Sequence, residues 1–146
     1  QCGFKVFNTN DRGIGSLRKE IECAVDGQDI TFFPDVYGQT IFLTTGPIMI
    51  DKNINIHLTT GDEITLRTSN VGPIFDVLQG KQLSLKNMTI YGGNNANGSA
   101  LINSGNLTLD NVIIYQSQGN PNLNSSILNQ NTGTINVLNN TQVKKE

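Results

Sequence analysis

The chain has little charge and no long apolar run. Charged residues make up 15% of its 146 residues, and its ten basic side chains form no run longer than a neighbouring pair. A nucleic-acid-binding surface needs a basic stripe, so we expect no nucleic-acid partner. No apolar stretch approaches the ~18 residues of a membrane-spanning helix. The sequence therefore predicts one folded domain without a membrane-spanning segment.

Histidine is scarce as well. His57 is the one histidine, and it directly follows an apolar segment. Serine and cysteine nucleophiles need a partnered histidine, and no nucleophile motif stands elsewhere in the chain. We interpret His57 as a surface or corner residue rather than a base or a metal ligand. The sequence predicts no catalytic residue, no metal site and no cofactor.

Charge is almost absent from the second half of the chain. Residues 87–143 hold one charged side chain, Asp110, together with fifteen asparagines. Asparagine accepts left-handed backbone at a corner and can form amide ladders between stacked strands. This composition is compatible with a stacked β-solenoid.

A six-residue motif returns in this half. Residues 85–90 (LKNMTI) are echoed by residues 109–114 (LDNVII) and, more loosely, by residues 138–143 (LNNTQV), and residues 52–56 (KNINI) are an earlier relative. Self-similarity at about 20–50 residues is typical of solenoids, in which each repeat buries its apolar face against its neighbours. Apolar residues alternate within the copies, as they do in strands. The shared asparagines are predicted to form one structural column: Asn53, Asn87, Asn111 and Asn140.

Short apolar segments group into coils. We expect four complete coils and an incomplete fifth, built from segments near residues 30–50, 54–77, 83–102, 107–128 and 135–143. The longer loops, residues 92–99 and 116–126, lie at one corner. Short strands with bends rather than hairpin reversals favour a parallel β-helix over a sandwich. The predicted fold is all-β: a right-handed parallel β-helix of about four to five coils over residues 28–146.

Residues 1–27 are predicted to cap the first coil. Ser16 is a suitable helix N-cap, and Gly27 is a suitable stop beyond the C-terminus of the helix. Between them an apolar stripe falls at helical spacing: Leu17, Ile21, Ala24 and Val25. The first coil of a solenoid exposes an apolar cross-section and open strand edges, which an amphipathic helix can cover.

The chain contains two cysteines, Cys2 and Cys23. On a helical wheel Cys23 lies roughly 150° from the centre of the apolar stripe, so it faces away from the core. The N-terminal strand can cross that outer face and bring Cys2 close. A disulfide would close about 20 residues, contribute roughly 3 kcal/mol and indicate an oxidising compartment. The alternative is a pair of free thiols in a reducing compartment.

Two surfaces are candidates for contact. Small polar side chains between apolar neighbours are predicted to share an outward column, which could meet a glycan or an ice surface or be plain solvated sheet: Thr65, Ser84, Thr108 and Asn136. The last coil has no predicted cap, and an exposed coil is a template for strand pairing. Ile135, Val137 and Val143 therefore form a candidate end for assembly.

The first coils resemble a known family. Residues 6–21 (VFNTNDRGIGSLRKEI) resemble the N-terminal cap module, "NTNDSGxGSLRxAI", of right-handed parallel β-helix repeat proteins that bacteria secrete or display as adhesin-like surface proteins. Residues 38–44 (GQTIFLT) and 48–56 (IMIDKNINI) resemble the segments that follow this module. The resemblance implies the same fold, secretion, and a role in adhesion or surface structure. The chain begins without Met, so we expect that any signal peptide is already removed.

The sequence thus predicts a secreted or cell-surface protein that is structural or adhesive and not an enzyme. Its lateral faces and the two corner loops would contact a cell-surface or glycan ligand. One alternative is a self-associating subunit of an oligomer or filament that stacks through the last coil.

A second alternative is a polysaccharide lyase or hydrolase, because parallel β-helices also house such enzymes. These activities need carboxylates stacked on adjacent coils, as an acid/base pair or as Ca²⁺ ligands. Asp76 is aligned with Asn103 and Asn129, and Asp110 is aligned with Lys86. We therefore expect no acidic cluster.

Overall fold

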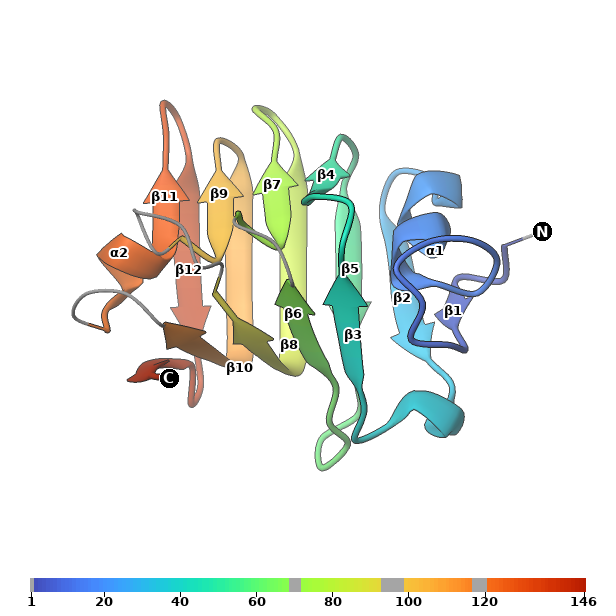
Figure 1. Ribbon diagram of the computed structural model, residues 1–146. Coiled ribbons are helices and arrows are strands. Elements are labelled where there is room, and N and C mark those ends of the chain that lie inside the picture. Colours follow the sequence, from blue (N-terminus) through green and yellow to red (C-terminus); the bar gives the residue numbers. More distant parts are fainter. Residues whose placement is uncertain (1, 69–71, 93–98, 117–120) are drawn as a thin grey trace.

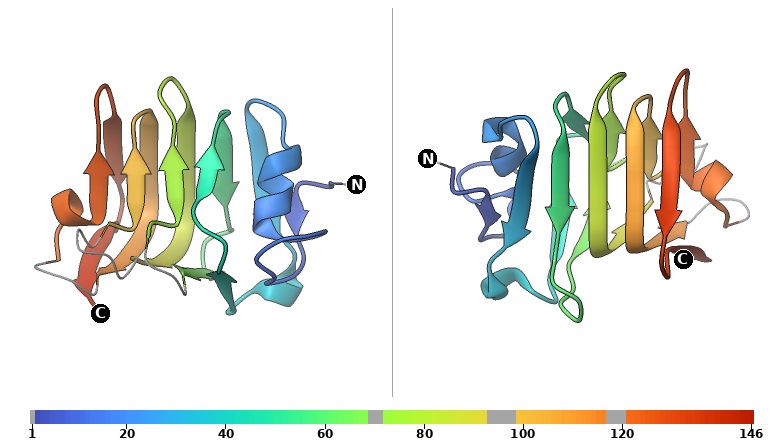
Figure 2. Two further views of the ribbon diagram at one scale, coloured as in Figure 1. Left: turned by 45° about the horizontal axis from the view of Figure 1, so that its top comes forward. Right: turned by 180° about the vertical axis from the view of Figure 1, so that it is seen from behind.

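The computed structural model describes residues 2–68, 72–92, 99–116 and 121–146. It is a parallel β-solenoid of about five coils that stack side by side along one axis (Figure 1), and a small helix lies at the N-terminal end. The predicted all-β solenoid fold and its N-terminal helix are confirmed. Figure 2 shows from behind how the strands of successive coils run in the same direction.

The strands stack into three faces. The first face contains β1 (Lys5–Val6), β2 (Gln28–Phe32), β5 (Ile54–His57), the N-terminal parts of β8 (Gln82–Tyr91) and β10 (Asn106–Gln116), and β12 (Thr134–Leu138). The second face contains β3 (Thr40–Leu43), β6 (Thr65–Thr68), the C-terminal parts of β8 and β10, and β13 (Gln142–Lys145). The third face contains β4 (Ile48–Ile50), β7 (Phe75–Val77), β9 (Leu101–Asn103) and β11 (Ile127–Asn129). The helical segments are α1 (Leu17–Cys23), η1 (Pro34–Val36) and α2 (Leu123–Ser126).

Columns of aliphatic side chains fill the interior. On the first face one fully buried column consists of Ile30, Ile56, Leu85 and Leu109. On the second face the equivalent column consists of Ile41, Leu66, Ile90 and Ile114. Because side chains alternate between the two sides of a strand, burying one set turns the residues between them outward.

The corner between the first two faces is made by asparagine. β8 and β10 each continue through this corner, where Asn87 and Asn111 adopt left-handed backbone with φ of 63° and 53°. The Nδ2 of Asn111 donates to the Oδ1 of Asn87 at 3.0 Å, and the Nδ2 of Asn87 donates to the carbonyl oxygen of Leu58 at 2.7 Å. The predicted bend and amide ladder are therefore present at these two positions.

The predicted asparagine column was wrong at its other two positions, Asn53 and Asn140. Asn53 directly precedes β5, and its neighbour Ile54 pairs with Leu83, so Asn53 lies at the start of the first face, well before the bend. In the last coil the bend residue is Asn139, with φ of 49°, rather than Asn140. The shift arises because Asp110 pairs with Leu138 and Ile113 with Gln142: three steps in one coil face four in the next.

The corner between the third and first faces depends on Asn103 and Gly105. Asn103 is fully buried, and its Nδ2 donates to the Oδ1 of Asn129 and to the carbonyl oxygen of Thr134, both at 2.9 Å. Its Oδ1 accepts from the backbone N–H of Gly105 at 3.1 Å. A Cβ at Gly105 would overlap the carbonyl oxygens of Lys81 and Leu78 in the preceding coil.

The cap helix begins as predicted and ends earlier. Ser16 is the N-cap and accepts from the backbone N–H of Lys19 at 3.1 Å. The helix stops at Cys23 instead of continuing toward Gly27, and Val25 is 62% exposed rather than part of the apolar stripe. The physical reason is Lys52, whose Nζ donates to the carbonyl oxygens of Ile21, Glu22 and Ala24 and so binds the end of a shorter helix.

Asp11 and Arg18 form an ion pair within the cap, and both also bond to the first coil. The guanidinium of Arg18 donates to the carboxylate of Asp11 at 3.0 Å and to the carbonyl oxygens of Gly46 and Pro47. The same carboxylate accepts from the backbone N–H of Thr44 and the hydroxyl of Thr45. Burial raises the pKa of Asp11, but the hydrogen bonds from Thr45 and Arg18, together with the remaining contacts, hold it below its usual value of 3.8.

Gly105→Ala is expected to lower the free energy of unfolding by about 1–3 kcal/mol, because backbone must shift to admit the methyl group. Gly3→Ala is the matched control, since a Cβ there meets no atom within 4 Å. We expect the control to change the free energy by less than about 0.5 kcal/mol. Urea unfolding followed by circular dichroism measures both, and equal effects would contradict the close approach at Gly105.

Asp11→Asn is expected to destabilise the protein at neutral pH by about 1–3 kcal/mol, because the half-buried carboxylate loses its charge-assisted hydrogen bonds. A carboxyl with a lowered pKa stabilises the fold above its unfolded value and stops doing so as pH falls through the folded value. The difference between the parent and Asp11→Asn should therefore shrink below about pH 4. Urea unfolding from pH 2 to 7 tests this, with exposed Asp51→Asn as the control. A difference that stays constant down to pH 2 would contradict the assignment.

Candidate functional site

The predicted contact face is only partly in register. Ser84, Thr108 and Asn136 do stack outward on the first face. Thr65 does not belong to this column and its assignment was wrong, because it pairs with Thr40 and Thr89 on the second face. The strand β8 contributes to both faces, and Ser84 precedes the Asn87 bend whereas Thr89 follows it.

Polar side chains of the first face bond to one another from coil to coil. The Nδ2 of Asn55 donates to Asp29 at 3.1 Å, and the Nε2 of Gln82 donates to Asn55 at 3.3 Å. Further along, the hydroxyl of Thr134 donates to Asn106 at 3.1 Å. Lys86 and Asp110 form an ion pair at 3.8 Å, as their predicted alignment suggested. A ligand on the first face would therefore compete with bonds that already exist.

The second face carries larger side chains. Residues that follow a buried aliphatic residue in successive coils stack into one outward column, called the aromatic column here: Phe42, Arg67, Tyr91 and Tyr115. The rings of Tyr91 and Tyr115 are stacked with centroids 4.8 Å apart, and the guanidinium of Arg67 lies 4.3 Å from the centroid of Tyr91. Phe42 is 48% exposed.

The charge of Arg67 is balanced within the chain. Its guanidinium donates to the carboxylate of Glu146 at 2.6 Å. Stacking on Tyr91 and pairing with Glu146 together hold the arginine side chain in one place. Three members of the aromatic column, Arg67, Tyr91 and Tyr115, are therefore held in place by contacts within the chain.

A hollow of about 250 Å³ lies beside the aromatic column, at the asparagine bend. Its walls include Asp62, Glu63, Thr89, Asn111 and Ile113. Within the described residues, neither carboxylate forms a hydrogen bond or an ion pair with its side chain. Thr89 also belongs to a column of outward hydroxyls with Thr40 and Thr65. We call this hollow the corner groove.

Reasoning from the sequence alone missed the aromatic column and the corner groove. A signal was present, because each column residue ends a similar triplet: TIF at 40–42, TLR at 65–67, TIY at 89–91 and IIY at 113–115. The last residue is Phe, Arg or Tyr, so the triplets are recognised as one column only when the strands are in register.

Asp76, on the third face, has no carboxylate in register with it on the neighbouring strands. Asp76 pairs with Met49 and Ile102, so its predicted alignment with Asn103 and Asn129 was off by one position. Burial raises the pKa of Asp76 above its usual value. Within the part of the chain that the structure describes, no group of three or more His, Cys, Asp or Glu side chains could hold a metal ion.

The predicted assembly end lies in the last coil. Ile135 and Val143 pack partly against the core, whereas Val137 is 41% exposed. β12 and β13 pair with β10. Self-association through these strands stays a prediction. Of the two predicted corner loops, residues 93–98 and 117–120 lie outside the described residues.

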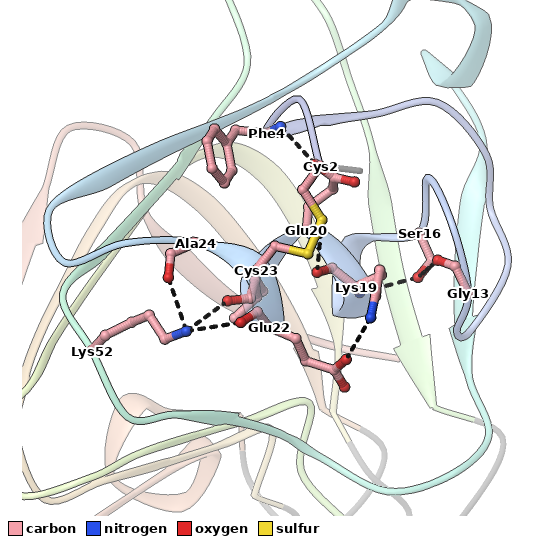
Figure 3. Close-up of a disulfide and its surroundings, with 11 residues drawn as sticks. Cys2, Phe4, Gly13, Ser16, Lys19, Glu20, Glu22, Cys23, Ala24 and Lys52 are labelled. Atoms are coloured by element: carbon pink, nitrogen blue, oxygen red, sulfur yellow. Dashed lines mark hydrogen bonds and ion pairs between the residues drawn. A yellow bond between two sulfur atoms is a disulfide. The ribbon is translucent and has the colours of Figure 1, made fainter.

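The predicted disulfide joins Cys2 of the N-terminal arm to Cys23 at the end of α1, across 21 positions (Figure 3). Beside it the backbone N–H of Phe4 donates to the buried carboxylate of Glu20 at 2.6 Å. Phe4 has a φ of 60°, which is rare for a bulky residue, and its side chain packs partly against the core. The disulfide thus holds a strained arm over the cap helix.

Reduction of Cys2–Cys23 is expected to lower the free energy of unfolding by about 3 kcal/mol, because the unfolded chain gains the freedom of the opened loop. Urea unfolding with and without dithiothreitol measures the change. The double variant Cys2→Ser/Cys23→Ser is the control, and its stability should not respond to dithiothreitol. An equal response of the parent and the variant would show that the reductant acts elsewhere.

Within the described residues, no helix has the length and apolar character needed to cross a membrane. Comparison of the chain with family models, with curated proteins and with solved structures finds no match.

Proposed function

We propose that the chain is a secreted or cell-surface protein with a structural or adhesive role and no catalytic activity, and that it makes contact through its second face. The observation that carries this proposal is the aromatic column. Tyrosine, arginine and phenylalanine are side chains that contribute strongly to binding when they are held in place. Here stacking and an ion pair hold Arg67, Tyr91 and Tyr115 in place on strands β6, β8 and β10, so these side chains lose little entropy on contact.

The first face is less suited to binding a ligand than the second face. Its polar side chains are already bonded between coils, as at Asn55–Asp29 and Thr134–Asn106. Breaking such bonds offsets what a polar ligand would contribute. The second face offers exposed Phe42 and the corner groove without this competition.

The disulfide supports secretion. Disulfides persist in oxidising compartments and are rare in the cytosol. The resemblance of residues 6–21 to the cap of secreted β-helix proteins agrees with this location. In that segment Asp11 and Arg18 join the cap to the first coil, which gives the motif a mechanical role.

The positions of Asp76 and Asp110 support a role without catalysis. Glycan cleavage uses two carboxyl groups held about 5–10 Å apart across the scissile bond, or carboxylates that bind Ca²⁺. Asp76 has the apolar neighbours Met49 and Ile102 in register. Asp110 is paired with Lys86.

An adhesion assay tests the proposal. Beads that carry the oxidised chain are placed under flow over films of cellulose, mannan, polygalacturonate, collagen and fibronectin. We expect retention on at least one film, and a loss of roughly tenfold or more for Phe42→Ala/Tyr115→Ala, because two anchor side chains are removed. The matched control, Ser84→Ala/Thr108→Ala on the first face, should be retained like the parent.

The same films test for catalysis. Soluble sugar ends released with and without Ca²⁺ are measured, and none are expected. Release of new ends would overturn the non-enzymatic assignment. Equal retention of both double variants, or no retention of the parent on any film, would overturn the adhesive role of the second face.

A further inference from the structure

We propose that the corner groove and the aromatic column form one binding site for an uncharged oligosaccharide, whose chain runs along strands β8 and β10. This inference rests on the proposed adhesive function and names the ligand class of the same face. It follows from three properties of the described residues: the spacing of the two parts, the chemistry of each part, and their charge.

The two parts lie next to each other along the strands. Thr89 and Ile113 line the groove, and Tyr91 and Tyr115 follow them by two positions on the same strands. Two positions in a strand span roughly 7 Å, and both residues of each pair point to the same side of the sheet. Adjacent units of one short polymer can therefore occupy the groove and the aromatic column together.

The aromatic column suits one side of a sugar ring. A pyranose has an apolar C–H side and a rim of hydroxyl groups, so it resembles the amphipathic surfaces that tyrosine binds well. Tyr91 lies between Tyr115, stacked on it at 4.8 Å, and the guanidinium of Arg67, so both faces of its ring are covered. The half-buried tyrosines therefore offer a sugar their ring edges and hydroxyl groups. Phe42 adds an exposed ring at the end of the same column.

The corner groove suits the hydroxyl groups. Its volume of about 250 Å³ falls just below the range of pockets for drug-sized ligands, about 300–1,000 Å³, so it matches a single small unit rather than a large ligand. The carboxylates of Asp62 and Glu63 are acceptors that no described residue engages. Sugar hydroxyls are donors that such acceptors can bind.

Charge excludes acidic sugars. The two carboxylates of the groove repel a uronate or a sulfated unit. The nearby Arg67 does not offset them, because Glu146 already balances its charge at 2.6 Å. Lys144, which is exposed and in register with Tyr115, adds one positive charge against the two negative charges of the groove. The whole chain carries a formal net charge of −2. The site is therefore complementary to a neutral glycan.

Tyrosine fluorescence provides a direct test, because the chain has three tyrosines and no tryptophan. The oxidised chain is titrated, in buffer with EDTA, with cellohexaose, maltohexaose, mannohexaose and the galacturonate hexamer. We expect a saturable change in emission with at least one neutral hexamer, and affinity at least roughly tenfold weaker for the charged hexamer. The variant Tyr37→Phe removes the tyrosine outside the site and should leave the affinity unchanged.

Variants separate the two parts of the site. Asp62→Asn/Glu63→Gln should weaken binding of the neutral hexamer by roughly tenfold while preserving the unfolding midpoint, because both side chains are on the surface. Ser84→Ala/Thr108→Ala should bind like the parent. Absence of binding to all neutral hexamers, equal affinity for the charged one, or no effect of the groove variant would each overturn the inference. Beads retained through the second face on collagen or fibronectin alone would overturn it as well, and would leave the adhesive function standing.

Discussion

The register of the buried aliphatic columns is the constraint on which the rest of the structure depends. A single coil of this chain cannot enclose its own apolar side chains, so Ile30, Ile56, Leu85 and Leu109 are buried only by stacking on one another. A slip of one residue would turn such a column toward solvent. The interior therefore determines which outward residues become neighbours.

The two large faces show how different chemistry results from one register. On the first face short amides, hydroxyls and carboxylates are close enough to form hydrogen bonds with the coil beside them. On the second face the side chains are larger, and they stack as rings and a guanidinium instead. Beside them lie Asp62 and Glu63, whose carboxylates no described residue engages.

The N-terminal end needs interactions of another kind, because no coil precedes the first one in the described structure. There α1 covers the apolar surface. Three contacts hold this helix: the disulfide at Cys23, the ion pair of Arg18 with Asp11, and the hydrogen bonds from Lys52 to its C-terminal end. A seven-residue helix is too short to be stable alone. Its stability comes from these contacts and from burial of its apolar stripe.

The sequence by itself determined the strands, the coils, the start of the cap helix and the bends at Asn87 and Asn111, because these follow from local periodicity, spacing and backbone preference. Only the tertiary structure decided the register between coils. The last bend contains one additional residue, so Asn139 rather than Asn140 is its bend residue. Because β8 bends at Asn87, Thr65 pairs with the part of β8 after the bend and lies on a different face from Ser84. Loops of unequal length separate these segments, so distance along the chain does not measure position around a coil. The aromatic column was hidden for the same reason, since its members become neighbours only when the aliphatic columns beneath them are stacked.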